Sequence, residues 1–248
     1  MSSFIGNSKG GIVVTIDDLR RVPTPAPTYS WKPVSHFEMV TVLKSKLEGK
    51  GLEITKESFS VASEGLNLFG VFNVSADHAP DVGLDSSFSI GFRHSNKKQF
   101  AIQMVAGLNV FVCSNLCFSG DMITLKRKHT SGLNLNWELD LAVERYLAKS
   151  AKLEDEINFM RARDVTPLEA KAFLVDNVVN GNLPQALLKT AYENYFEHDD
   201  NKPDCADRTA WGLHNAVTRA IRDANLVPES KFGITIKLGS IIRKLLNH

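Results

Sequence analysis

Short apolar segments rich in Val, Ile and Phe, separated by turn residues, fill residues 52–128 and predict a series of strands. The predicted strands are Ile54–Val61, Leu66–Val74, Phe88–Arg93, Phe100–Ala106, Asn109–Cys113 and Ile123–Arg127. From about residue 136 the spacing of apolar residues becomes helical, and it predicts a first helix that extends to about Arg163. A second helix is predicted from the start signal Thr166-Pro167-Leu168-Glu169, a third after Pro184, and a fourth over Ala206–Ala224. Because strands precede helices rather than alternate with them, the pattern predicts an α+β fold: an N-terminal, mainly antiparallel sheet with one early helix, followed by a helical C-terminal region.

Three segments follow from this pattern. Residues 1–35 are predicted to be an extended arm, because prolines at 23, 25, 27 and 33 keep the chain from forming a helix. Residues 36–135 form a strand-rich basic region that opens with a helix, capped by Ser35 and Glu38 and ended by Gly49. Residues 136–248 form a helical region with a basic tail. One continuous domain and two subdomains meeting near residue 135 are both compatible with this division.

Composition describes an ordinary globular chain, with 43% hydrophobic and 23% charged residues and a net charge of +1. No overall field therefore marks it as a nucleic-acid-binding protein. The charge is uneven, however: residues 88–130 hold six basic side chains against a single acid, Asp121. The tail from residue 231 carries Lys231, Lys237, Arg243 and Lys244 and no acid.

The three cysteines and the apolar pattern bear on location. An odd cysteine count, and a start without the apolar core of a signal peptide, favour reduced thiols in a cytoplasm. No apolar run approaches the ~20 residues of a membrane span. We therefore expect a cytoplasmic protein without membrane contact.

Candidate metal, phosphate and catalytic motifs are weak. Cys113 and Cys117 supply two ligands of the four that zinc needs, and although His94 and His129 could complete the set, buried apolar cysteines are the commoner case. The segment Gly6–Gly11 lacks the spacing of a phosphate-binding loop, and no nucleophile–base signature is present. The sequence thus predicts no metal, no cofactor and no catalytic residue. An enzyme assembled from distant residues stays the third-ranked alternative.

The basic segments predict a binding surface. Arg93, Lys97 and Lys98 flank one turn, and Lys126, Arg127 and Lys128 close the same strand-rich region. Single-stranded nucleic-acid binders combine such cations with aromatic rings on which bases stack. Four phenylalanines are interleaved with these charges: Phe92, Phe100, Phe111 and Phe118. The competing interpretation is a set of solvated turns around a buried sheet, with the phenylalanines in its core.

Several longer stretches resemble a family of phage- and plasmid-borne proteins catalogued as a domain of unknown function. They are Thr24–Thr28 with Pro33 and His36, Leu68-Phe69-Gly70, Gly91–Ser95, Val112–Gly120, Lys126–Thr130 and Thr209–Thr218. Within this neighbourhood the chain looks like the single-stranded-DNA-binding cofactor of a phage-encoded RNA polymerase, found in podoviruses that carry a virion polymerase. The resemblance implies a viral DNA-binding protein that acts in phage transcription, with that polymerase as a partner.

The expected function is therefore single-stranded DNA binding without catalysis. The residues expected to contact DNA are Arg93, Lys97, Lys98, Lys126, Arg127 and Lys128, with Arg243 and Lys244 of the tail contributing or mediating homo-oligomer formation. The alternative is a phage or plasmid protein that binds a host protein, for example to blunt a defence system, without binding nucleic acid. The two differ in one geometric requirement: DNA binding needs both basic segments on one surface.

Overall fold

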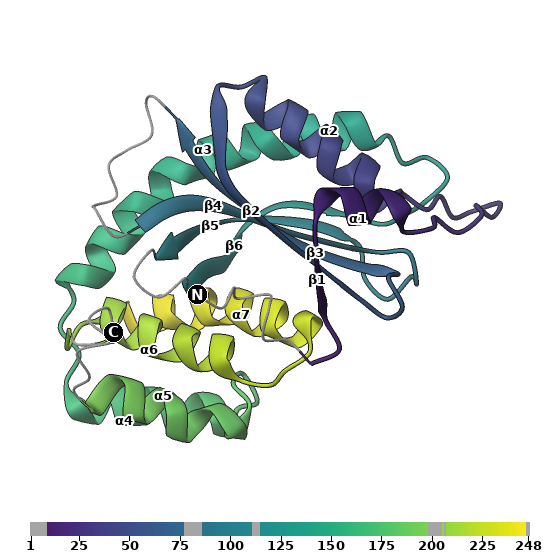
Figure 1. Ribbon diagram of the computed structural model, residues 1–248. Helices are drawn as coiled ribbons and strands as arrows, with labels where there is room; N and C mark the ends of the chain where they lie inside the picture. The colour runs from purple at the N-terminus through teal and green to yellow at the C-terminus, as the bar shows by residue number, and fades with distance from the viewer. Residues whose placement is uncertain (1–8, 77–85, 111–114, 198–204, 206, 247–248) are drawn as a thin grey trace.

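A curved six-stranded antiparallel sheet forms the centre of the protein (Figure 1). The computed structural model describes residues 9–76, 86–110, 115–197, 205 and 207–246. Its strands are β1 (Ile12–Val14), β2 (Leu52–Ala62), β3 (Asn67–Ala76), β4 (Ser86–Ser95), β5 (Ile102–Val110) and β6 (Asn115–Arg127). Each strand pairs with its neighbour in sequence, in the order β1 to β6, so the sheet is a simple meander. The predicted α+β class is confirmed.

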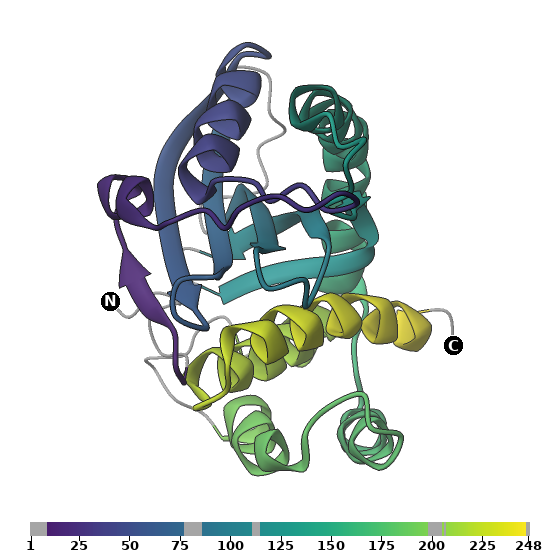
Figure 2. The same ribbon diagram turned by 90° about the vertical axis from the view of Figure 1, so that its right-hand side faces the viewer.

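Helices cover both faces of this sheet (Figures 1 and 2). The helices α1 (Ile16–Arg21), α2 (His36–Glu48) and α3 (Leu135–Ala162) lie on one side. On the other side lie α6 (Ala210–Asp223) and α7 (Pro228–Leu246), and outside them α4 (Pro167–Val179), the short 3₁₀ helix η1 (Gln185–Leu187) and α5 (Leu188–Phe196). In the described part of the chain, no helix is both long enough and apolar enough to cross a bilayer.

The buried apolar side chains form one cluster that runs from Leu19 to Ile242. On the face toward α2 and α3, the rings of Phe59, Phe72 and Phe92 pack with centroids 5.0–6.3 Å apart. The Phe92 ring lies over Gly70, where a Cβ atom would come within 2.2 Å of it. Close packing of this kind leaves no room for added atoms, so Gly70 is required by the position of the ring.

Helix α6 is buried all round, because α7 and the sheet lie on one side of it and α5 on the other (Figure 1). Every residue from Ala210 to Ile221 is buried. Its polar side chains therefore bond within the protein: Thr218 Oγ1 donates to His214 O at 3.1 Å, for example. The Asn194 amide of α5 donates to Ala216 O at 3.1 Å and ties the two helices together.

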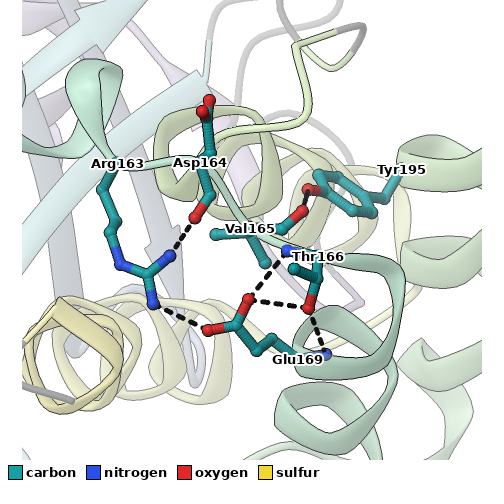
Figure 3. A network of polar contacts seen from close by, with 6 residues as sticks. All are labelled: Arg163, Asp164, Val165, Thr166, Glu169 and Tyr195. Atoms are coloured by element: carbon teal, nitrogen blue, oxygen red, sulfur yellow. Dashed lines mark hydrogen bonds and ion pairs between the residues drawn. The ribbon is translucent and has the colours of Figure 1, made fainter.

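The junction between α3 and α4 is held by a polar network (Figure 3). Thr166 and Glu169 form the predicted capping box at the start of α4. Arg163 binds Glu169 Oε1 through Nη2 at 2.7 Å and also donates to Asp164 O. These contacts hold the pKa of the Glu169 carboxyl down to about 2. Val165 N donates to Arg208 O at 2.8 Å, so the junction also fixes the segment that enters α6.

Four predicted elements differ from the structure. The reversal expected at Gly107 is absent from the described chain, because β5 continues through it to Val110, and β6 begins at Asn115 rather than near Ile123. The arm is extended only from residue 22 onward, since residues 12–21 contain β1, which pairs with β2, and α1. The basic tail is the helix α7, which Pro228 starts at its first position.

Candidate nucleic-acid interface

The two predicted basic segments lie at the same end of the sheet. In the strand register Arg93 pairs with Gln103 and Gln103 pairs with Lys126, so these three positions form one row across β4, β5 and β6. Paired residues share a face, and two strand spacings separate β4 from β6 by about 10 Å. Lys97 and Lys98 continue from β4 into the turn at this end, and Lys128 continues from β6. Both basic segments therefore lie at one end of the sheet, while a shared DNA-binding surface stays a prediction.

Five residues make up this basic end: Lys97, Lys98, Lys126, Arg127 and Lys128. All five are exposed. Arg127 is bound to Glu138 in the first turn of α3, with Nε 2.8 Å from Oε1, so part of its charge is compensated. The exposed acid Glu64 lies in the β2–β3 turn at the same end, which leaves the excess of positive charge on the β4–β6 side. The exposed side chains of Lys97, Lys126 and Lys128 are accessible to phosphates in solution.

Arg93 differs from the prediction, because its guanidinium points into the interface between the sheet and α7. It lies between the rings of Phe100 and Phe232, 4.7 and 4.8 Å from their centroids, and Nε donates to Gln103 Oε1 at 3.1 Å. Burial lowers the pKa of Arg93 and the nearby Glu229 carboxylate opposes that shift. Arg93 is half-buried and packs between the two rings, so it differs from the exposed lysines of the basic end.

Arg243 and Lys244 also lie elsewhere. Helix α7 begins beside the sheet end, where Asn67 Nδ2 donates to Glu229 Oε1 at 2.7 Å. Arg243 follows fourteen residues later, about 21 Å along the helix axis, and its Nη2 binds Glu156 of α3 at 2.6 Å. The C-terminal end of α7 is at the opposite side of the molecule from the β4–β5 turn (Figure 1). The tail therefore does not extend the basic end.

Of the four phenylalanines interleaved with the basic residues, the structure describes the side chains of Phe92 and Phe100. Phe92 is fully buried, and Phe100 packs on Phe69 and Arg93. Phe111 and the side chain of Phe118 lie outside the described residues. Instead, the arm brings Trp31 to the turn, with Lys98 Nζ 4.6 Å above its ring. No spacing in the sequence indicates that residue 31 returns to the end of β6, so sequence reasoning had no signal for this contact.

Three histidines lie directly beneath the basic end. His36 Nε2 is 2.6 Å from Gly65 O, and since a carbonyl only accepts, this nitrogen carries the proton. In the neutral ring Nδ1 is then the acceptor, so His94 Nε2 donates to it across 2.7 Å. His129 stacks on His94 with centroids 5.4 Å apart. The Gly65 carbonyl therefore determines which ring nitrogen carries the proton in both His36 and His94.

These histidines carry no charge at neutral pH. Burial is the main cause in each case: it lowers the pKa of His36, lowers that of His94 well below its usual value, and lowers that of His129 to about 4. Among the described residues, His94 Nδ1 has no hydrogen-bond partner. The backbone of Lys32 opposes the lowering of the His129 pKa. The positive charge of the basic end thus comes from lysine and arginine alone.

The bond from His36 also fixes an unusual turn between β2 and β3. Ser63, Glu64 and Gly65 all have positive φ angles, of 51°, 58° and 84°. The left-handed region is unfavourable for Ser and Glu, so the surrounding contacts must hold them there. The His36 ring, buried against the turn, supplies one such contact.

The cysteine pair weighed above as a metal motif lies largely outside the described residues. Cys113 and the side chain of Cys117 are not among the described residues, and Cys205, which is described, is a buried thiol. Across the described ranges, no group of three or more His, Cys, Asp or Glu side chains is arranged to hold a metal ion. Of the Gly6–Gly11 segment, the structure describes Lys9 onward, and Lys9 N donates to Leu226 O at 2.9 Å.

Comparison with known proteins yields one match. A family model described as "Domain of unknown function (DUF932)" covers residues 28–231. The chain belongs to the DUF932 family. The DUF932 region begins at the arm segment that carries Trp31 and includes the whole basic end, whereas β1, α1 and most of α7 lie outside it. Arg243 and Lys244 are therefore not part of the family match. No curated protein and no solved structure matches the chain.

Proposed function

We propose that the protein binds single-stranded DNA at its basic end and serves as a DNA-binding cofactor in phage transcription. One observation carries the binding step: the register Arg93–Gln103–Lys126 brings Lys97 and Lys98 to the same end of the sheet as Lys126 and Lys128. Exposed lysines on one surface attract the phosphate backbone and release its counterions. The phage setting and the polymerase partner rest on the sequence resemblance alone.

Binding should depend steeply on salt and on two lysines. Reversing Lys126 and Lys128 to glutamate is expected to weaken binding of a short fluorescent oligonucleotide by about tenfold or more. The slope of log affinity against log salt should become less negative by about 0.7 for each phosphate contact removed. Fluorescence anisotropy at two or more salt concentrations measures both quantities.

A matched control is the pair Lys56→Glu and Lys237→Glu, which changes the net charge equally on exposed positions of β2 and α7. It should leave the affinity within about twofold, since only charges within a Debye length of roughly 10 Å act strongly. Equal losses in both double variants would show a response to net charge and remove the assignment to the basic end. Wild-type protein that binds no oligonucleotide at low salt would overturn the proposed function.

The alternative, a protein that binds a host protein, is favoured by a different feature. A groove of about 800 Å³ lies between α4 and α5, and its lining is mainly apolar. Leu174, Val175 and Tyr192 line it, and Val175 and Tyr192 are exposed. Apolar grooves of this kind accept side chains of partner proteins. An electrophoretic shift assay on short single strands separates the two functions, because only the first gives a shift at low salt.

A further inference from the structure

The arm forms a tight hairpin at residues 28–31. Thr28 N donates to Trp31 O at 2.9 Å and Trp31 N donates to Thr28 O at 3.4 Å, which leaves Tyr29 and Ser30 at the tip. The Tyr29 side chain is fully exposed, at 101% of its reference area. Burying a ring of this size would contribute roughly 2 kcal/mol to the stability of the fold, and Tyr29 does not make that contribution. Packing therefore does not explain why an aromatic residue is found at this position.

The arm hairpin is fixed to the end of β6. Trp31 forms an antiparallel bridge with Thr130, Ser131 N donates to Ser30 O at 3.2 Å, and Lys32 N donates to His129 O at 3.3 Å. These bonds join it to the segment that directly follows Lys126–Lys128. Figure 2 shows the arm crossing the front of the sheet at this end. The exposed ring is therefore held in place rather than carried on a free loop.

The second basic segment also contacts the arm hairpin. Lys98 Nζ lies 4.6 Å above the Trp31 ring, and Lys98 itself has a positive φ angle of 62°. Asn96, two residues earlier, binds both backbone groups of Val34, accepting from N at 3.2 Å and donating to O at 2.8 Å. Both basic segments thus adjoin the arm hairpin, which carries Tyr29 at its exposed tip.

We infer that the arm hairpin is a stacking platform for an unpaired nucleobase, with Tyr29 as the ring on which the base lies. Exposed aromatic rings next to cations are the usual arrangement for binding single strands, because the phosphates bind the cations while each base covers a ring. A base within a duplex is already stacked and paired, so the platform selects single strands over duplexes. This inference rests on the proposed function, and it assigns to Tyr29 the specificity of binding for single strands.

The test compares a thymine oligonucleotide with an abasic strand of the same length, which keeps the phosphates and lacks the bases. Wild-type protein is expected to bind the thymine strand about tenfold more tightly than the abasic one, the effect of one stacked base. Tyr29→Ala should abolish this ratio while leaving the salt dependence unchanged. Tyr29→Phe should preserve it, because the ring remains. Phe159→Ala, which removes an exposed aromatic ring of α3, is the matched control and should behave as wild type.

The outcomes separate the two proposals. A wild-type protein that binds the thymine and abasic strands equally, with a steep salt dependence, overturns the stacking platform and leaves the basic end intact. A Tyr29→Ala variant that weakens binding to both strands equally also overturns it, because the ring then acts on the fold. Failure of wild type to bind either strand at low salt removes the proposed function itself.

Discussion

Lowering the pH from about 7.5 to 5 is expected to reduce the free energy of unfolding by several kcal/mol. Burial lowers the pKa of four histidines, His36, His94, His129 and His214, and for the last two it does so from the ordinary 6.5 to about 4. The unfolded chain therefore binds protons near pH 6.5 at all four positions, whereas in the folded chain these rings bind protons only at lower pH, about 4 for His129 and His214. His129 and His214 each account for a loss of about 2 kcal/mol at pH 5, and His36 and His94 add to it.

The sign follows from where the protons bind. For His129 and His214, neither state binds the proton above pH 6.5, and their contribution to stability is complete. Between pH 6.5 and 4 the unfolded state gains these protons, so stability falls as the pH falls, and below pH 4 these two groups add no further change. Carboxylates with lowered pKa, such as Glu169 at about 2, act only at more acidic pH. Because a domain is typically stable by 5–15 kcal/mol, a loss of this size can approach complete unfolding.

Urea denaturation followed by circular dichroism at several pH values between about 4.5 and 7.5 measures this effect. The slope of the free energy of unfolding against pH reports the number of protons taken up on unfolding. His129→Gln should lower that number by up to one, whatever the substitution does to the stability at pH 7.5. A free energy of unfolding that stays constant between pH 7.5 and 5 would contradict the burial of these rings.

Replacing Gly70 with alanine is expected to destabilise the fold by about 3 kcal/mol. The added Cβ would lie 2.2 Å from the Phe92 ring, which is fully buried and packed against Phe59 and Phe72. In a strand interior alanine is otherwise no worse than glycine, which has no side chain to pack. The sign of the effect is therefore decided by the ring, and thermal or urea denaturation measures it.

Two further variants test the cause. Phe92→Leu in the Gly70→Ala background should recover part of the loss, so that the two substitutions are not additive. Gly233→Ala, within α7, meets no atom within 4 Å of its Cβ and should stabilise the protein by up to about 1 kcal/mol. If the effects of Gly70→Ala and Phe92→Leu on the free energy of unfolding are simply additive, the overlap with the Phe92 ring is not the source of the destabilisation.

Local signals predicted the elements that depend on neighbouring residues. The helix start at Thr166–Glu169 forms the expected capping box, and Ser35 caps α2 through its bond from Glu38 N. The α7 helix was not predicted, because residues 231–248 were interpreted from their charge as a basic tail. Its apolar residues Phe232, Leu238 and Ile242 are nevertheless buried at helical spacing on one side. The reversal expected at Gly107 failed because glycine fits a strand interior equally well where another element packs closely.

What the sequence alone determined is the fold class, the position of most strands and helices, and the concentration of positive charge between residues 88 and 130. These depend on local periodicity and composition, which act over a few residues. Only the tertiary structure decided which cations lie at the same end of the sheet: it places Lys97, Lys98, Lys126 and Lys128 there as exposed side chains, packs the half-buried Arg93 between two rings, and pairs Arg243 with Glu156. It also brought Tyr29 and Trp31 to that end through bonds to residues about a hundred positions away. Strand register and long-range packing set these neighbours, and neither leaves a periodic trace in the chain.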